Sequence, residues 1–188
     1  SVVAVNHFMS ALEPLLETDE LPGVDEINQA VNAANNAVFQ MAEEDRELEG
    51  MGTTLVAAYI CGNQVRIVNV GDSRAYLIRK RRIRQLTVDH SYVQELLRRG
   101  KITAEEAKFH PNRNLITKAV GVDQYVEADI YEGDLGVDDT LLLCSDGLCG
   151  IVSDEKILEI INEADDQEDA AMHLRHAAYD AGARDNLT

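Results

Sequence analysis

The spacing of apolar residues changes near residue 50, and this change limits the folds that the chain can adopt. Before it, apolar residues recur every three or four positions, which predicts one helix from residue 2 to about residue 16 and a second from a cap at Asp25 to about Asp45. After Gly50-Met51-Gly52, short apolar runs alternate with turn residues, which predicts strands joined by hairpins. The chain must therefore pack helices against strands.

The apolar runs after residue 50 predict the strands, and helical patterns fill most of the remaining sequence. The expected strands are 53–61, 65–70, 75–78, 83–86, 126–131 and 140–145, with tight turns at Gly62-Asn63 and Lys80-Arg81. The expected helices are two short ones between residues 91 and 108, divided at Gly100 with a cap at Thr103, one that starts at Ser153, and one from about Gln167 to Gly182. Consecutive strands flanked by pairs of helices predict an α+β fold built on antiparallel sheet.

A length of 188 residues suits one domain, and no repeat, linker or low-complexity tract divides the chain. The opening helix has no cap or turn before it, and Leu187-Thr188 has the composition of an opening strand. We therefore expect a single domain over residues 1–188 that is truncated at both ends.

The formal net charge of −17 argues against nucleic-acid binding, which needs a basic surface. The charges are unevenly distributed, because 13 of the 17 basic residues but only five acidic ones lie between Arg66 and Lys118. An acidic body suits the capture of cations, and the basic segment suits contact with an anionic substrate. Solvated faces of hairpins and helices explain the basic segment equally well.

Cysteine usage and hydropathy bear on where the protein resides. The longest apolar run, from Leu55 to Cys61, is much shorter than the ~20 residues of a membrane span, and no basic stretch leads into an apolar core at the N-terminus. The three cysteines form no CxxC motif, which predicts reduced, structural thiols. Together these features predict a cytoplasmic protein without a membrane span.

Three aspartates follow strands or stand in tight turns, where catalytic groups collect. Asp72 follows the strand that ends at Val70, Asp146 follows the apolar run from Leu141 to Cys144, and Asp185 follows the last helix. Taken alone, each is also explained as a turn residue, because an aspartate bonds to nearby backbone amides. Hard cations such as Mg²⁺ and Mn²⁺ prefer oxygen ligands and can be held by isolated carboxylates without a His/Cys cluster.

Two other kinds of site are disfavoured by the sequence. The five histidines lack the usual pairing with cysteines that marks a zinc site. Neither Cys144 nor Cys149 lies in a glycine-rich, arginine-bearing loop that would stabilise a thiolate and bind phosphate, which argues against a cysteine nucleophile.

Six motifs occur in a specific order along the chain. They are Gly52-Thr53-Thr54, Gly71-Asp72-Ser73-Arg74-Ala75-Tyr76, Leu86-Thr87 with Asp89-His90-Ser91, His110-Pro111 with Arg113-Asn114, Ser145-Asp146-Gly147-Leu148, and Asp185-Asn186-Leu187-Thr188. Together they closely resemble the bacterial branch of the metal-dependent protein phosphatases, the protein phosphatase 2C family, over residues 52–188. Each motif alone is weak, and their order makes the resemblance specific.

The resemblance implies a sandwich of two antiparallel β-sheets flanked by helices on both outer faces. It implies that Asp146 and Asp185 ligate two catalytic ions, Mg²⁺ or Mn²⁺, and that Asp72 holds a third, looser ion together with Asp146. Residues 87–118 correspond to the flap beside the active site, where Arg113 is a candidate substrate contact. The family's bridging aspartate and its general-acid histidine have no counterpart in this sequence, and we expect them upstream of Ser1.

The activity implied by the resemblance is hydrolysis of phosphoserine and phosphothreonine on proteins by a metal-bridged water. The implied partners are proteins phosphorylated by a serine/threonine kinase, and a monomer is expected. Three alternatives stay open: a catalytically inactive module of the same fold that binds phosphorylated partners, a hydrolase of small phosphate esters, and an unrelated α+β binding domain with aspartates in its turns.

Overall fold

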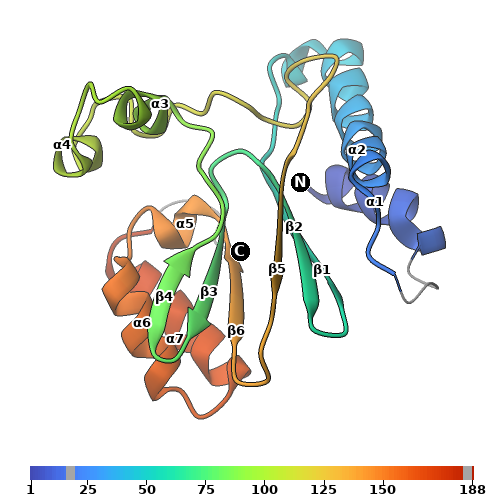
Figure 1. Ribbon diagram of the computed structural model, residues 1–188. Helices are drawn as coiled ribbons and strands as arrows, with labels where there is room; N and C mark the ends of the chain where they lie inside the picture. Colours follow the sequence, from blue (N-terminus) through green and yellow to red (C-terminus); the bar gives the residue numbers. More distant parts are fainter. Residues whose placement is uncertain (16–19, 184–187) are drawn as a thin grey trace. The chain divides into compact units, whose positions relative to one another are not determined.

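The computed structural model describes residues 1–15, 20–183 and 188 (Figure 1). The chain divides into two compact units. The first comprises Ser1–Asp72 and Val88–Asp134, and the second comprises Ser73–Thr87 and Leu135–Thr188. Each unit has its own three-stranded antiparallel sheet and its own hydrophobic core, as an α+β fold requires.

The sheet of the first unit contains β1 (Leu55–Cys61), β2 (Gln64–Val70) and β5 (Asp129–Asp134) in the order β1-β2-β5. The predicted turn at Gly62-Asn63 joins β1 to β2, with Cys61 opposite Gln64. On its other side β2 pairs with β5, and Val68 is opposite Ile130. Because side chains alternate along a strand, Val68 and Val70 lie on the same face of β2, and both are buried in the core.

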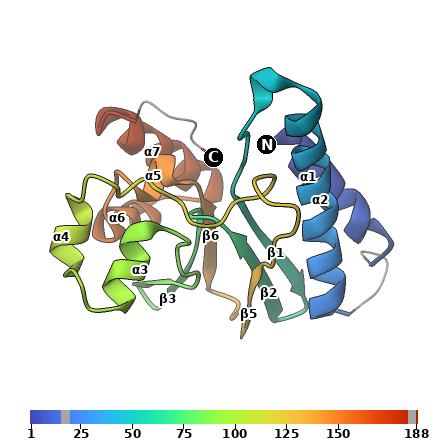
Figure 2. The same ribbon diagram turned by 90° about the horizontal axis from the view of Figure 1, so that it is seen from above.

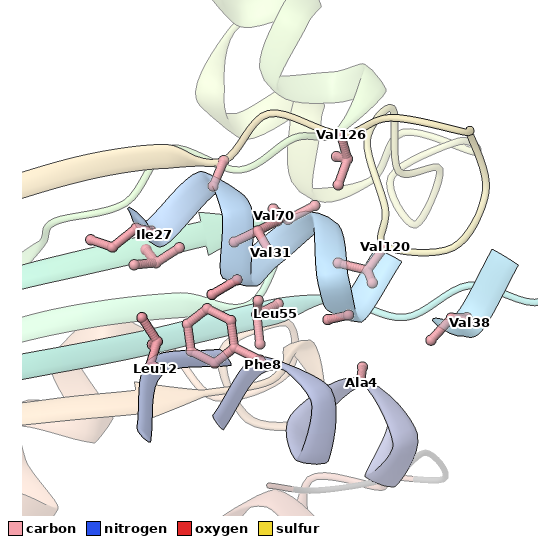
Figure 3. Close-up of a cluster of buried hydrophobic side chains, with 14 residues drawn as sticks. Ala4, Phe8, Leu12, Ile27, Val31, Val38, Leu55, Val70, Val120 and Val126 are labelled. Atoms are coloured by element: carbon pink, nitrogen blue, oxygen red, sulfur yellow. The ribbon is translucent and has the colours of Figure 1, made fainter. Parts of the chain in front are cut away.

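Helices α1 (Val2–Leu12) and α2 (Val24–Glu44) cover that face, with short 3₁₀ turns at Glu13–Leu15 and Arg46–Leu48. The buried side chains of the helices form one cluster with the sheet, which includes Phe8, Ile27, Val31, Leu55 and Val70 (Figure 3). Full burial of an apolar side chain of this size stabilises the fold by about 1.5–3 kcal/mol. Many of the apolar residues whose spacing predicted α1 and α2 are therefore residues that these helices bury against the sheet.

The start of α2 differs from the prediction, because Gly23 and not Asp25 is the N-cap. The Glu26 carboxylate accepts a hydrogen bond from the Gly23 N–H at 2.6 Å, so a side chain inside the helix satisfies the backbone before it. Asp25 lies in the first turn, where its negative charge interacts favourably with the helix dipole.

The strand predicted at residues 126–131 begins later, at Asp129. Side chains of α2 bond to the backbone that precedes it. Asn32 donates to the Val126 carbonyl at 2.8 Å and accepts from the Val126 N–H at 3.2 Å, and Asn28 accepts from the Ala128 N–H at 3.2 Å. These bonds take the place of a strand ladder, so the apolar pattern at 126–128 reflects burial against a helix.

Two short helices, α3 (Tyr92–Arg98) and α4 (Ala104–Lys108), project away from the sheet of the first unit (Figure 2). They confirm the prediction of a helical pair divided at Gly100. Ser91 caps α3, and Thr103 caps α4 through a capping box with Glu106. The backbone bridge between Ser91 and Ile116 joins the two ends of this segment, whose residues 87–118 were predicted to form a flap.

The sheet of the second unit contains β3 (Arg74–Arg79), β4 (Arg82–Gln85) and β6 (Thr140–Cys144) in the order β4-β3-β6. Helices α5 (Asp146–Cys149), α6 (Asp154–Glu163) and α7 (Gln167–Asp180) complete this unit. Its core contains Tyr76, Ile78, Cys144, Ile157, Leu174 and Ala178. The predicted cap at Ser153 is confirmed, since its hydroxyl accepts a hydrogen bond from the Lys156 N–H.

In the part of the chain that the structure describes, none of the helices has the length and apolar character needed to span a bilayer.

Candidate metal centre

Asp146 is the first residue of α5, two residues after the buried end of β6 at Cys144. Its side chain is exposed, whereas the next two residues of α5 are buried and anchor the short helix in the core. Gly150 N–H donates to the Asp146 carbonyl at 2.8 Å, and a Cβ atom at position 150 would lie 2.6 Å from that oxygen. The fold therefore presents the Asp146 carboxylate to solvent from a backbone that is fixed on both sides.

Residue 188 lies beside the same corner of the second unit. The Ser145 N–H donates to the Thr188 carbonyl at 3.2 Å, and the Thr188 N–H donates to the Ser145 hydroxyl oxygen at 3.2 Å. These two hydrogen bonds attach the end of the sequence next to Asp146. Asp185 lies outside the described residues, so its predicted role as a metal ligand stays a prediction, as does the strand expected to start at Leu187.

Asp72 lies in the first unit, in a tight turn directly after β2, and is half-buried. The preceding Gly71 has φ +111°, and a Cβ atom there would lie 2.4 Å from Thr54 Cγ2 and 3.2 Å from Thr54 Cα. A glycine is therefore required at this position on both steric and dihedral grounds. Its carbonyl accepts hydrogen bonds from the His90 N–H at 3.0 Å and from Asn69 Nδ2 at 3.2 Å.

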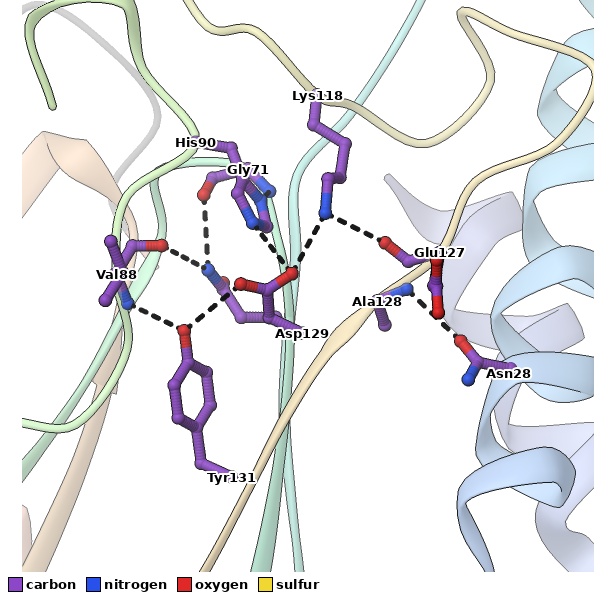
Figure 4. A network of polar contacts seen from close by, with 10 residues as sticks. Asn28, Gly71, Val88, His90, Lys118, Glu127, Ala128, Asp129 and Tyr131 are labelled. Carbon is purple, nitrogen blue, oxygen red and sulfur yellow. Dashed lines mark hydrogen bonds and ion pairs between the residues drawn. The ribbon is translucent and has the colours of Figure 1, made fainter. Parts of the chain in front are cut away.

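His90 connects this turn to the start of β5 through a network of polar contacts (Figure 4). The Gly71 N–H donates to His90 Nδ1 at 2.9 Å, so Nδ1 carries no proton and the neutral ring is protonated at Nε2. Nε2 lies 3.2 Å from Asp129 Oδ1, at the start of β5. Burial lowers the pKa of His90, and the nearby charge of Lys118 lowers it further, which favours the neutral ring.

Asp129 is the centre of the network. Lys118 Nζ donates to its Oδ1 at 2.9 Å, and the Tyr131 hydroxyl donates to its Oδ2 at 3.4 Å. Partial burial alone would raise the pKa of Asp129, but the contacts with Lys118 and His90 outweigh it and lower that pKa. The Val88 N–H in turn donates to the Tyr131 hydroxyl at 3.0 Å, so the network reaches both ends of the flap, at Val88 and Lys118.

The network was not predicted from the sequence. Asp89-His90-Ser91 contributed to the family resemblance, but nothing in the spacing of Lys118 and Asp129 indicated that His90 would meet them. The contacts depend on the pairing of β2 with β5, which brings Asn69 opposite Asp129. A register between strands that are about 60 residues apart is not a local property of the sequence.

Arg113, the candidate substrate contact, lies on an exposed turn after α4, where its N–H donates to the His110 carbonyl at 3.1 Å. Its role stays a prediction. Over residues 1–15, 20–183 and 188, no three His, Cys, Asp or Glu side chains gather as metal ligands. The described residues therefore supply single carboxylates, exposed at Asp146 and half-buried at Asp72, whose oxygens suit a hard divalent cation. They do not form a complete metal centre among themselves.

Comparisons with known proteins extend the resemblance beyond the quoted motifs. A model of the protein phosphatase 2C family matches residues 1–177, which includes α1 and α2. The serine/threonine phosphatase Stp of Listeria monocytogenes is 42% identical over 162 residues, which cover 86% of this chain and 64% of that protein. The chain thus spans less than two thirds of the length of this relative.

Solved structures show the same fold. A crystal structure of the Mycobacterium tuberculosis serine/threonine phosphatase PstP/Ppp superposes with a TM-score of 0.87 at 39% identity, covering 98% of this chain and 78% of that one. The catalytic domain of the serine/threonine protein phosphatase PstP in complex with two manganese ions gives a TM-score of 0.83 at 37% identity, covering 100% of this chain and 78% of that one. These similarities confirm the predicted fold class of antiparallel sheets with flanking helices.

Proposed function

Because the chain belongs to the protein phosphatase 2C family, we propose that the full-length protein is a metal-dependent phosphatase of phosphoserine and phosphothreonine in proteins. The observation that carries this proposal is the exposed carboxylate of Asp146, which stands on a fixed turn at the end of β6. Its motif, Ser145-Asp146-Gly147, lies within the residues that the family model matches. The name of the Listeria relative supports the same activity.

Asp146 and Asp185 are the proposed ligands of two catalytic ions, and Asp72 with Asp146 the proposed ligands of a third. Mg²⁺ or Mn²⁺ fits these carboxylates, because hard divalent cations prefer oxygen donors and keep several waters. The PstP catalytic domain was solved with two manganese ions, which supports a pair of ions here. The ligands that this sequence does not supply are proposed to come from other residues of the full-length protein, within one catalytic domain that includes residues 1–188.

When bound, the metal ions supply a water of lowered pKa and offset charge on the phosphoryl oxygens. The protein's own part is to place charged oxygen ligands at fixed positions. The buried residues of α5 and the hydrogen bond from Gly150 hold the backbone of Asp146, and Gly71 and His90 hold the turn before Asp72. Such pre-organisation lets the site bind the transition state without rearranging.

The proposed substrates are proteins phosphorylated by a serine/threonine kinase, and we propose a cytoplasmic monomer. The names of relatives in Listeria monocytogenes and Mycobacterium tuberculosis support the substrate class.

Hydrolysis in ¹⁸O-labelled water tests this proposal. The full-length protein, incubated with Mn²⁺ and a phosphothreonine peptide, is expected to release phosphate that carries one solvent oxygen, and the quenched protein is expected to carry no phosphoryl group. Excess chelator is expected to abolish the release. Phosphate release that persists in chelator would contradict the metal-dependent mechanism, and peptide binding without turnover would identify a non-catalytic module instead.

A further inference from the structure

The turn between β3 and β4 in the second unit carries the densest basic sequence of the chain, Arg79-Lys80-Arg81-Arg82-Ile83-Arg84. We call these six residues the basic hairpin. Ile83 is opposite Ile78 and packs against the core of the unit, which fixes the hairpin in place. Arg79 is directly opposite Arg82, and like charges at such a pair of positions destabilise a sheet.

Arg79 of the hairpin forms an ion pair with Asp139, and the charge of Lys80 also acts on that carboxylate. Arg79 Nε donates to Asp139 Oδ1 at 2.9 Å and Nη2 donates to Oδ2 at 2.5 Å, so the pair is bidentate. In the described part of the chain, no ion pair joins the other four basic side chains, Lys80, Arg81, Arg82 and Arg84, to a carboxylate. All four residues are exposed, so the hairpin presents an excess of positive charge to solvent.

The two residues at the tip adopt a backbone conformation that does not suit them. Lys80 has φ 51° and Arg81 has φ 59°, and they are the two non-glycine residues with positive φ among those described. Side chains with a Cβ atom disfavour this region by about 1–2 kcal/mol per residue, and a two-residue turn of this kind favours Asn-Gly. Lysine and arginine at the tip therefore lower the free energy of unfolding of the protein. Backbone strain that is retained at particular residues is a reason to look for a function there.

Protection of a sheet edge explains only part of this charge. β4 is an edge strand of its sheet, and charged side chains on an edge discourage pairing with other chains. That role accounts for Arg82 and Arg84, which lie on the strand. It does not account for Lys80 and Arg81, which lie in the turn and form no part of the ladder.

The basic hairpin lies at the far end of its sheet from Asp146. Arg74 is opposite Cys144, two residues before Asp146, and Lys80 lies six residues further along from Arg74. At about 3.3 Å per residue this separation is about 20 Å, and Figure 1 shows the β3–β4 turn at the end of the sheet away from α5. The hairpin is therefore distinct from the proposed catalytic site.

We propose that the basic hairpin docks an acidic segment of the phosphoprotein substrate, remote from the phosphorylated residue. This inference rests on the proposed function for the identity of the substrate. The chain as a whole carries −17, so it repels acidic polypeptides except where positive charge is concentrated. A membrane or a nucleic-acid duplex presents an extended anionic surface, which the acidic remainder of the protein would repel. A short acidic segment can contact Lys80, Arg81 and the neighbouring arginines of the basic hairpin alone.

The variant Lys80→Asn/Arg81→Gly separates docking from folding, because it removes two charges and places Asn-Gly in a turn that favours it. Its melting temperature is expected to equal or exceed that of the wild type. The matched control is Lys156→Gln/Arg175→Gln, which removes two charges from exposed positions on α6 and α7 of the same unit.

The substrates for the test are two phosphothreonine peptides that differ in one cluster of four residues, glutamate or glutamine, about seven residues from the phosphothreonine. The full-length wild-type protein with Mn²⁺ is expected to show a KM about 3- to 10-fold lower for the glutamate peptide. In the hairpin variant this preference is expected to vanish, while kcat and the hydrolysis of p-nitrophenyl phosphate stay unchanged. The control is expected to keep the full preference.

Three results would overturn the proposal: no preference in the wild type, an undiminished preference in the hairpin variant, or equal loss in the control. Loss of binding to phosphatidylserine vesicles by the hairpin variant, with its peptide preference kept, would assign the hairpin to a lipid surface instead. Failure of the proposed phosphatase activity can be distinguished from failure of the docking proposal. If the wild type hydrolyses neither p-nitrophenyl phosphate nor peptide, anisotropy of a labelled, unphosphorylated glutamate peptide still measures docking by the same variants.

Discussion

Gly71 shows how strongly a single residue can determine the geometry of the proposed site. It precedes Asp72, adopts φ +111°, and approaches Thr54 so closely that no Cβ atom fits. Its amide and carbonyl groups both bond to His90. The position of the Asp72 backbone therefore depends on the absence of one side chain and on the presence of one imidazole.

Replacing Gly71 by alanine is expected to lower the free energy of unfolding by at least about 2 kcal/mol, because the added methyl meets Thr54 and the backbone is strained. Gly62→Ala is the matched control. Gly62 also has positive φ, at 58°, but a Cβ atom there would meet nothing within 4 Å, so a cost of only about 1 kcal/mol is expected. Urea unfolding of both variants measures the difference, and equal losses would show that contact with Thr54 is unimportant.

His90 gives the protein a predictable response to acid. Its pKa is lowered in the folded state, so below pH ~6.5 the unfolded chain binds a proton that the folded chain does not. The free energy of unfolding is therefore expected to fall as the pH drops below that value. Asp129, with its own lowered pKa, adds a second loss at lower pH, below about 4, where the unfolded carboxylate is protonated first.

The contribution of His90 is measured by comparison with His90→Asn, whose side-chain oxygen can still accept the hydrogen bond from the Gly71 N–H. Urea unfolding in chelator at a series of pH values is expected to give a shallower slope between pH 6.5 and 5 for the variant. Parallel curves for the two proteins would rule out a lowered pKa of His90.

At the scale of elements, local patterns predicted helices and hairpins well. They misplaced the N-cap of α2, which is Gly23 and not Asp25, and the start of β5, where distant side chains replace backbone partners. The turn at Lys80-Arg81 and the cap at Thr103 depend on neighbouring residues, and both are confirmed. The start of β5 depends on Asn28 and Asn32, about 95–100 residues earlier, whose amides bond to the segment before it. Single-sequence periodicity contains no information on such contacts.

The same dependence makes Asn35 of α2 a structural residue. It is fully buried, accepts a hydrogen bond from the Gly121 N–H at 2.7 Å, and donates to the Asp123 carbonyl at 2.8 Å. Asn35→Ala is expected to cost about 2–4 kcal/mol, because both backbone groups lose their partner. Asn36→Ala, on the exposed side of the same helix, is expected to be neutral or slightly stabilising. Similar melting temperatures for the two variants would contradict this assignment.

At the scale of the whole molecule, the sequence predicted the family and the fold class, but it did not predict the contacts around the candidate site. The three aspartates were predicted to be metal ligands only through the six ordered motifs, because each aspartate alone is also explained as a turn residue. The structure then adds what motifs cannot contain: Asp146 is exposed on a rigid turn, residue 188 is bonded beside it, and His90 ties the Asp72 turn to β5. These features arise from tertiary contacts between segments far apart in the sequence.

The most direct test of the account is calorimetric titration of Mn²⁺ into the full-length protein and its Asp146→Asn variant. The wild type is expected to bind at least two ions, by analogy with the manganese complex of PstP. The variant is expected to lose affinity by more than about ten-fold, with an unchanged circular dichroism spectrum, because a neutral amide replaces a charged ligand at little steric cost. The control Asp138→Asn, at an exposed position of the same unit, is expected to bind like the wild type. Undiminished Mn²⁺ binding by Asp146→Asn would contradict the proposal that this carboxylate holds the catalytic metal.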